Sequence, residues 1–229
     1  MGERKDRLIA FVLYPGASPL ELVGPLTVLR DLRIGTRYRS VVVAEQLEPM
    51  QSDTSLRLVA ARTFEEVQRP FALFVPGGAG AELAARDAAL LAYVRTAGAT
   101  AQIVGSTGNG AVILAAAGLL TGRRVATHWA YRDVIESAGA TYVAERWVED
   151  GPLLTAAGSA AGIDAMLHLT AKLRSESAAR LAQLWMEYDP QPPFGRPDPK
   201  DRDASLAATL RSRPAFTVGQ QGGSPDVSA

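Results

Sequence analysis

Short, uniformly apolar runs recur along the chain and end in turns that are rich in glycine and proline. A run in which every position is apolar is typical of a parallel strand that is covered on both faces. Residues 8–13 form the first such run, which ends at Pro15-Gly16. The pattern predicts strands at residues 8–13, 40–44, 72–75, 102–105, 124–127 and 153–155.

Between these runs, apolar residues recur at intervals of three and four, which is the period of an amphipathic helix. In residues 161–173, for example, Ile163, Met166 and Leu173 share one face. The pattern predicts helices at residues 19–32, 81–97, 111–120, 131–138, 161–173 and 177–188.

The alternation of strands and helices, joined by short Gly-rich turns, predicts an α/β domain with a mainly parallel sheet. We see no internal repeat and no linker, so residues 1–189 are expected to form a single domain. The composition changes at residue 190, where a proline-rich stretch is followed by charged residues and then by Gly and Ser. We therefore expect residues 190–229 to form a Pro-rich C-terminal arm and a disordered tail.

Composition excludes several classes of function. The chain has 24 basic and 24 acidic residues, so a protein that binds nucleic acid through its phosphates is not expected. It has no cysteine, which excludes disulfides, thiolate zinc sites and a cysteine nucleophile. No His and carboxylate residues have the spacing of metal ligands, and neither a P-loop nor a dinucleotide-binding motif is present, so we expect no metal and no cofactor.

No targeting segment is visible near the N-terminus. Residues 1–7 are charged, and the apolar run at 8–13 is too short for a signal peptide or a membrane span. We therefore expect a cytoplasmic protein that does not associate with membranes.

Candidate chemistry lies in the loops that follow the predicted strands, because ligands of parallel α/β sheets bind beyond the carboxyl ends of the strands. These loops are residues 14–21, 76–80 and 105–110. The third has the strand–turn–helix layout of a nucleophile elbow, in which backbone N–H groups can hold an oxyanion. The alternative is a Gly-rich turn without a ligand.

Several motifs, in the same order along the chain, carry a resemblance to a known family. Val75-Pro-Gly-Gly78, Gly105-Ser-Thr-Gly-Asn-Gly-Ala111 and Ala126-Thr-His-Trp129 are three of them, and residues 14–25 and 159–164 are two more. The chain resembles the ThiJ/PfpI superfamily over about residues 8–197. This resemblance implies the fold of class I glutamine amidotransferases, a flavodoxin-like three-layer sandwich.

Within this superfamily, the chain is most similar to isonitrile hydratases and to the amidotransferase-like domain of certain AraC-type regulators. Residues 187–194 are similar to the C-terminal arm of isonitrile hydratases in particular. The resemblance also implies a homodimer.

The resemblance places Gly108 where the family has its nucleophilic cysteine. The family pattern is Cys-Thr-Gly, and alignment on residues 114–120 puts Gly108, Asn109 and Gly110 at these three positions. Glycine adopts a positive φ without strain, and we expect its missing side chain to open space for a substrate atom. Ser106 would belong to the strand end, so we do not expect it to replace the cysteine.

Glu21 is the acid that remains, since it occupies the position where the family has an Asp or Glu that points at the nucleophile. A carboxyl in a dry pocket has a raised pKa and can act as a general acid or base near neutral pH. The alternative is a carboxylate stabilised by the N-terminus of its helix.

Other site residues follow from the resemblance. Asn109 could supply its side-chain amide, and its backbone N–H together with that of Gly78 would match the family's oxyanion hole. His128 aligns with a histidine near the family site and is a candidate catalytic residue, although a packed structural residue is the alternative. We assign Gly77, Gly78, Thr107, Gly108 and Gly110 to substrate binding.

These residues predict a cofactor-independent enzyme on a small molecule, which hydrates, eliminates or isomerises it with Glu21 as general acid/base and without a covalent intermediate. The alternative is a non-catalytic small-molecule-binding or regulatory pseudoenzyme. The 21 arginines against 3 lysines suggest a GC-rich genome, in which a step of secondary metabolism is an option.

Overall fold

The computed structural model describes residues 6–195, 197–201 and 203–211. A seven-stranded sheet with the order β10-β11-β7-β6-β1-β2-β5 forms the centre of the molecule. Its strands pair in parallel except for β10, which is antiparallel to β11. The strands are β1 (Arg7–Val12), β2 (Tyr38–Ala44), β5 (Arg62–Thr63), β6 (Ala72–Val75), β7 (Ile103–Thr107), β10 (Trp147–Asp150) and β11 (Leu153–Ala156).

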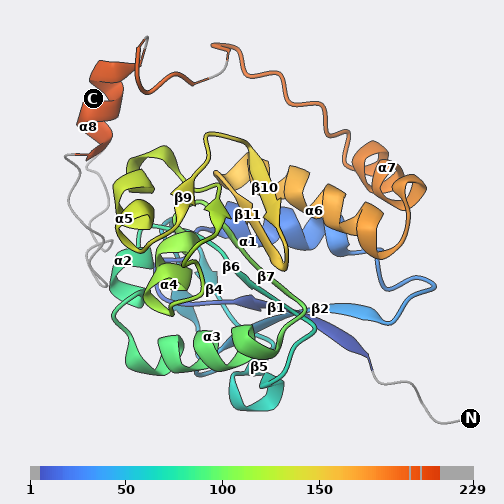
Figure 1. Cartoon of the computed structure of the whole chain (residues 1–229). Coiled ribbons are helices and arrows are strands. Elements are labelled where there is room, and N and C mark those ends of the chain that lie inside the picture. The colour runs from blue at the N-terminus through green and yellow to red at the C-terminus, as the bar shows by residue number, and fades with distance from the viewer. Residues whose placement is uncertain (1–5, 196, 202, 212–229) are drawn as a thin grey trace, which may run out of the picture.

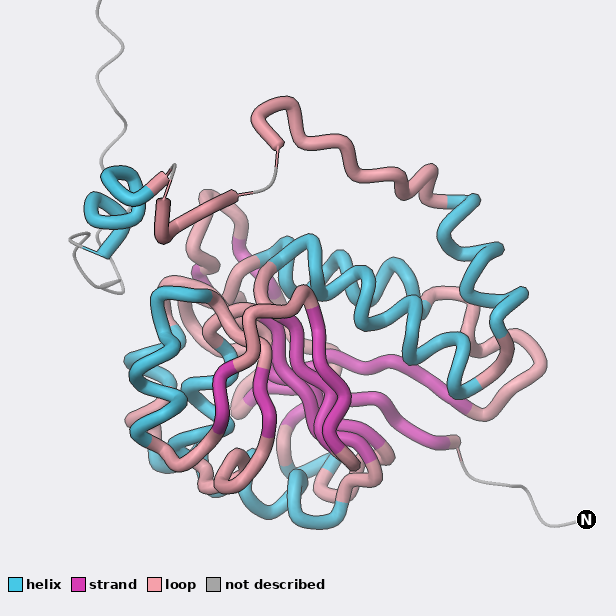
Figure 2. Tube along the Cα trace, turned by 45° about the horizontal axis from the view of Figure 1, so that its top comes forward, coloured by secondary structure: helices cyan, strands magenta, loops and turns pink. Residues whose placement is uncertain are grey.

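Helices cover both faces of the sheet (Figures 1 and 2). One face carries α1 (Pro19–Leu29), α6 (Ser159–Leu173) and α7 (Glu176–Trp185). The other carries α2 (Ala81–Ala84), α3 (Ala88–Thr100), α4 (Gly110–Ala116) and α5 (Arg132–Ser137). The prediction of a single-domain, flavodoxin-like three-layer α/β sandwich is therefore confirmed.

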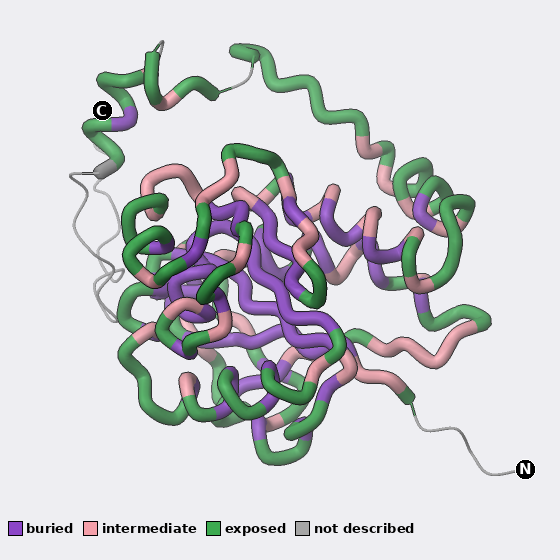
Figure 3. Tube along the Cα trace, viewed as in Figure 1, coloured by how far each residue is buried: buried purple, intermediate pink, exposed green. Residues whose placement is uncertain are grey.

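The core lies where the sequence is uniformly apolar. All residues of β6 and β7 are buried, as are the last four of β1, and Figure 3 shows buried positions concentrated in the central strands. Phe11 of β1 stacks on Phe74 of β6, with ring centroids 5.4 Å apart. Coverage of the sheet on both faces explains why β6 and the last four residues of β1 are uniformly apolar.

The helix predicted at residues 81–97 is wrong as one element, because the structure has α2 and α3 there. The Asp87 carboxylate accepts hydrogen bonds from Ala89 N (2.9 Å) and Leu90 N (3.1 Å), which makes Asp87 the N-cap of α3. Helix α4 ends at Ala116, before the predicted residue 120, and Gly118 follows with a φ of +77°.

Several short elements were not predicted, because two or three residues carry too little periodicity to be recognised. They are β3 (Met50–Gln51), β4 (Arg57–Leu58), η1 (Glu65–Val67), β9 (Thr141–Tyr142) and η2 (Trp129–Tyr131), together with strands β5 and β10 of the main sheet. The strand predicted at residues 124–127 corresponds to β8 (Arg124–Val125), which is two residues shorter.

The segment predicted as arm and tail contains a helix, α8 (Ala204–Arg211). Figure 1 shows the preceding residues leaving α7 as an extended chain that runs to the other side of the domain. Phe194, in this extended chain, is 89% exposed. The predicted tail beyond residue 211 lies outside the described residues.

Among the described residues, no helix combines the length and the apolar character that crossing a membrane requires.

Candidate active site

The turn between β7 and α4 has a backbone that suits glycine. Gly108 has a φ of +52°, a region that residues with a Cβ rarely adopt. Its N–H donates to Ala156 O (2.9 Å), and its carbonyl accepts from Thr127 Oγ1 (2.7 Å). These bonds fix the turn at the carboxyl ends of β7 and β11.

Glu21 reaches this turn from the first turn of α1, a helix that begins with Pro19. Only 8% of Glu21 is exposed. Its Oε2 accepts a hydrogen bond from Gly77 N (2.8 Å), and its Oε1 accepts one from Ser159 Oγ (3.2 Å). The carboxyl is thus held by the loop after β6 and by the first residue of α6.

The Glu21 carboxyl fills the space beside Gly108. A Cβ at position 108 would lie 2.8 Å from Glu21 Cδ and closer still to both carboxyl oxygens, which is nearer than real Cβ contacts come. The expectation that the missing side chain of Gly108 opens space for a substrate atom is therefore wrong, because the Glu21 carboxyl occupies that space.

Burial raises the pKa of Glu21 above its ordinary value, since removal from water penalises the charged carboxylate. Hydrogen bonds from Gly77, Thr107 and Ser159 act in the opposite direction, and the negative charge of Asp53 adds to the rise. This balance favours a protonated Glu21 at higher pH than for an exposed glutamate.

Asp53, in the turn between β3 and β4, is a second carboxyl near the site. Burial raises its pKa, while hydrogen bonds from the Ala79 N–H and the Ser18 side chain oppose the rise. The sequence did not single out this residue, because residues 45–71 carry little periodic signal.

Asn109 and Gly78 form a reciprocal pair of hydrogen bonds. Gly78 N donates to Asn109 Oδ1 (2.8 Å), and Asn109 Nδ2 donates to Gly78 O (3.0 Å). The amide and the Gly78 N–H, both expected to polarise a substrate, are therefore bonded to each other in this structure. A substrate that uses the Gly78 N–H must first displace Asn109 Oδ1.

Tyr131 joins this pair to the protein surface, and sequence reasoning missed it. Its hydroxyl donates to Glu82 Oε1 (3.0 Å) and also has a hydrogen bond with the Asn109 side chain. Burial raises its pKa, so the hydroxyl keeps its proton. The sequence could have pointed to Tyr131 only through its position close to His128 in the chain. Ser159 was also missed, although it opens one of the motifs that carried the resemblance.

His128 is half-buried and contacts its neighbours in the chain. Its Nδ1 accepts from Ala130 N (3.4 Å), and its ring lies 5.1 Å from Trp129 and 6.1 Å from Tyr131 between centroids. Burial lowers the pKa of the imidazole and favours its neutral form. These contacts link His128 to Asn109 by way of Tyr131.

The other predicted loop residues line the same turn. Thr107 Oγ1 lies 3.5 Å from the Glu21 carbonyl oxygen, to which it donates. A Cβ at Gly77 would lie 2.5 Å from both Asn109 Oδ1 and Glu21 Oε2, and one at Gly110 would lie 2.7 Å from Pro76 O. Gly77 is therefore required by close packing against Glu21 and Asn109, and Gly110 by close packing against the backbone of Val75 and Pro76.

Ser106 is buried, and among the described residues its hydroxyl has no hydrogen-bond partner. It precedes Thr107 on β7, so the two side chains lie on opposite faces of the sheet. Because Thr107 lies on the side of Glu21, Ser106 points away from that carboxyl.

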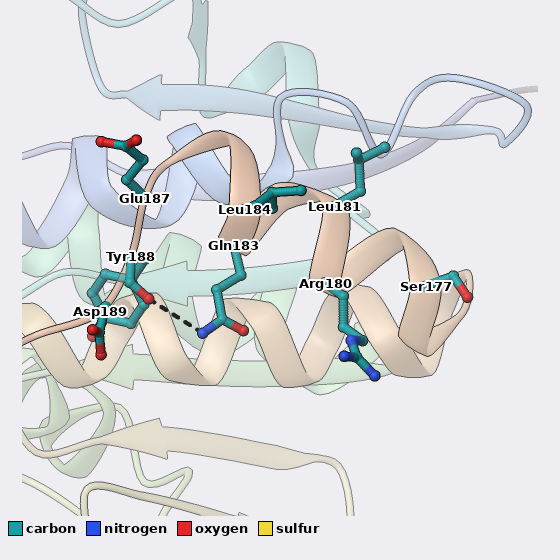
Figure 4. Close-up of a pocket in the computed structure, with 8 residues that line it drawn as sticks. All are labelled: Ser177, Arg180, Leu181, Gln183, Leu184, Glu187, Tyr188 and Asp189. Carbon is teal, nitrogen blue, oxygen red and sulfur yellow. Dashed lines mark hydrogen bonds between the residues drawn. The ribbon is translucent and has the colours of Figure 1, made fainter.

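No group of three or more His, Asp or Glu side chains within the described ranges could hold a metal ion. An open hollow lies along α7, apart from the Glu21 turn, and Figure 4 shows its lining side chains. It is lined by Ser177, Arg180, Leu181, Gln183, Leu184, Glu187, Tyr188 and Asp189, none of which is a predicted site residue.

Comparison with known proteins gives consistent matches. The DJ-1/PfpI family model matches residues 7–172. The chain is 39% identical to isonitrile hydratase of Pseudomonas putida over 207 residues, which is 90% of each chain. It is 31% identical to the HTH-type transcriptional regulator CdhR of Pseudomonas aeruginosa, over 88% of this chain and 59% of the regulator.

A solved structure of a ThiJ/PfpI family protein from Pseudomonas syringae superimposes with a TM-score of 0.83 at 38% identity. The match covers 90% of this chain and 85% of that protein.

Proposed function

Because the chain belongs to the DJ-1/PfpI family, we propose that it is a cofactor-independent enzyme of the isonitrile hydratase type, with Glu21 as its general acid/base. The observation that carries this proposal is the buried Glu21 carboxyl with a raised pKa, set among backbone donors at the carboxyl ends of the central strands. No cysteine is available for a thiolate route.

The proposed reaction adds water to the terminal carbon of an isonitrile and yields an N-substituted formamide. The protonated Glu21 carboxyl donates its proton to that carbon, which becomes electrophilic, and the carboxylate then accepts a proton from the attacking water. Positioned proton transfer of this kind contributes about 10²–10⁴-fold to rate. Asn109 and Gly78 provide the polar groups that orient the substrate nitrogen once their mutual hydrogen bonds open.

The test is turnover of alkyl and aryl isonitriles by the purified chain, followed by formation of the formamide. Glu21→Gln keeps the size of the side chain but cannot exchange a proton, so we expect kcat to fall by about 10²–10⁴-fold. Glu176→Gln is the matched control, because Glu176 is also in the first turn of a helix but is exposed. Equal turnover by wild type and Glu21→Gln contradicts the proposal.

The second candidate is a non-catalytic binding protein, and the Gly78–Asn109 pairing favours it. A backbone donor that is already satisfied by a side chain is a poor oxyanion site unless the side chain moves. The similarity to CdhR, a transcriptional regulator, gives this candidate a precedent in a related protein. Saturable isonitrile binding without product, unchanged by Glu21→Gln, supports this candidate over the enzyme.

We also propose that the chain forms a homodimer, as the resemblance implies. Exposed apolar side chains on α7, such as Leu184 at 74%, are compatible with a protein interface. Sedimentation velocity of the full chain across a concentration series tests this, and a monomer at all concentrations contradicts it.

A further inference from the structure

The geometry around Gly108 points to a second role for Glu21: we infer that its carboxylate is a covalent nucleophile that attaches to the substrate carbon. This inference rests on the proposed function for its substrate, an isonitrile. It differs from acid/base catalysis alone because it requires a bond between Glu21 and the substrate during turnover.

Position is the first argument. Both Glu21 carboxyl oxygens and Cδ lie where a side chain at position 108 would begin. The resemblance assigns the nucleophile to this turn, so an electrophile approaching the same point would meet the Glu21 carboxyl. Carboxylates of Asp and Glu are established nucleophiles in other enzyme classes.

The two oxygens of Glu21 are held differently, which identifies the attacking atom. Oε2 is fixed by a backbone donor, Gly77 N, at 2.8 Å, whereas Oε1 is held by the rotatable Ser159 hydroxyl at 3.2 Å. Oε1 can therefore leave its partner at little cost. Oε2 becomes the acyl carbonyl oxygen and keeps its bond from Gly77.

The first step is an addition in which all atoms are retained. The Glu21 carboxyl proton moves to the terminal carbon of R–N≡C, and Oε1 forms a bond to that carbon. The product is Glu21–C(=O)–O–CH=N–R, an O-acyl formimidate. No oxidant or leaving group is needed, and the Glu21 carboxyl supplies the proton, since burial raises its pKa and so favours the protonated form.

The second step consumes one water molecule. Water adds to the formimidate carbon, the bond from that carbon to Oε1 breaks, and Glu21 recovers its carboxyl proton. The product released is R–NH–CHO. The sum of the two steps is the hydration of the isonitrile, so the covalent route leads to the product of the proposed function.

The experiment treats the full chain with cyclohexyl isocyanide, with and without hydroxylamine, and follows turnover, intact mass and the peptide that contains Glu21. We expect an acid-quenched adduct heavier by one isonitrile molecule. In hydroxylamine we expect attack on the acyl carbon, which converts Glu21 to a hydroxamate and inactivates the enzyme only while isonitrile is present. Glu21→Gln should give neither product, and Glu176→Gln should behave like wild type.

The outcomes separate the two proposals. Turnover in hydroxylamine with neither an adduct nor a Glu21 hydroxamate overturns the covalent role and leaves the hydratase standing. A stable Glu21 adduct without turnover supports the covalent role and overturns the hydratase. Neither turnover nor adduct overturns both.

Discussion

The Glu21 carboxyl occupies the place that a Cβ on Gly108 would take, although the two residues belong to different elements, α1 and the turn after β7. The carboxyl is buried there and bonded on both oxygens. Glu21 can therefore lie at this place only because residue 108 has no side chain.

Replacement of Gly108 by alanine should be costly for two reasons. The φ of +52° strains a residue with a Cβ by about 1–2 kcal/mol, and the added methyl group would displace the Glu21 carboxyl, with an overpacking cost of about 1–3 kcal/mol. Urea denaturation of Gly108→Ala measures the sum as a fall in the free energy of unfolding.

Gly118→Ala is the matched control for backbone strain. Gly118 has a φ of +77°, and a Cβ added there would point into open space, with no packing neighbour within 4 Å, so this variant loses stability through strain alone. We expect Gly108→Ala to lose more stability than Gly118→Ala, and the excess to shrink in a Glu21→Ala background. Equal losses of unfolding free energy in the two glycine variants would show that the Glu21 carboxyl moves aside for the added methyl group without a measurable cost.

The raised pKa of Glu21 predicts how stability depends on pH. A carboxyl with a higher pKa when folded binds more protons in the folded than in the unfolded chain, so its contribution is full below the unfolded value of 4.5. This contribution to the free energy of unfolding decreases as the pH rises from that value to the folded pKa. Above the folded pKa, it no longer changes with pH. Glu21→Gln should remove this decline, so its free energy of unfolding relative to wild type should rise with pH across that window.

Asp53 has a raised pKa as well and should contribute a decline of the same sign. Asp53→Asn therefore serves as a second variant, and the double variant shows whether the two carboxyls titrate together. A wild-type stability that rises with pH through the same window, relative to Glu21→Gln, contradicts the raised pKa.

The fold could be predicted because strands buried on both faces leave a signal in every residue. Residues 72–75 were expected as a strand and match β6, since each of them contributes to the core. The elements that were missed, such as β3 and β9, are two residues long and owe their pairing to strands elsewhere in the chain. Local pattern carries no signal for such elements.

The site could be predicted as a set of residues but not as an arrangement. Glu21 and Gly108 were both identified. That the Glu21 carboxyl fills the space beside Gly108, however, depends on the path of α1 across the ends of the strands. Likewise, Asn109 was expected to face a substrate, whereas it bonds to Gly78, which is 31 residues away. Pairings over such separations follow from tertiary packing and not from spacing.

The break between α2 and α3 predicts a capping effect at Asp87. Asp87→Ala removes the acceptor for Ala89 N and Leu90 N and should cost about 1 kcal/mol in the free energy of unfolding. Asp87→Asn keeps a side-chain oxygen at this N-cap and should lose much less. Similar losses for both variants, measured in urea, would mean that charge and not capping dominates there.

The Asn109–Gly78 pair gives a prediction that also separates the two candidate functions. Asn109→Ala leaves the Gly78 N–H and carbonyl without their partner and should cost about 1–3 kcal/mol in the free energy of unfolding. Tyr131→Phe is the control, because it removes the hydroxyl that contacts Asn109 but leaves the pair itself intact, so its loss should be smaller. If Asn109 orients the substrate, Asn109→Ala lowers kcat/KM for an isonitrile by about 10²-fold, as loss of a polarising donor does. If Asn109 instead blocks the Gly78 N–H, the same variant raises turnover or ligand affinity, because the backbone donor becomes free.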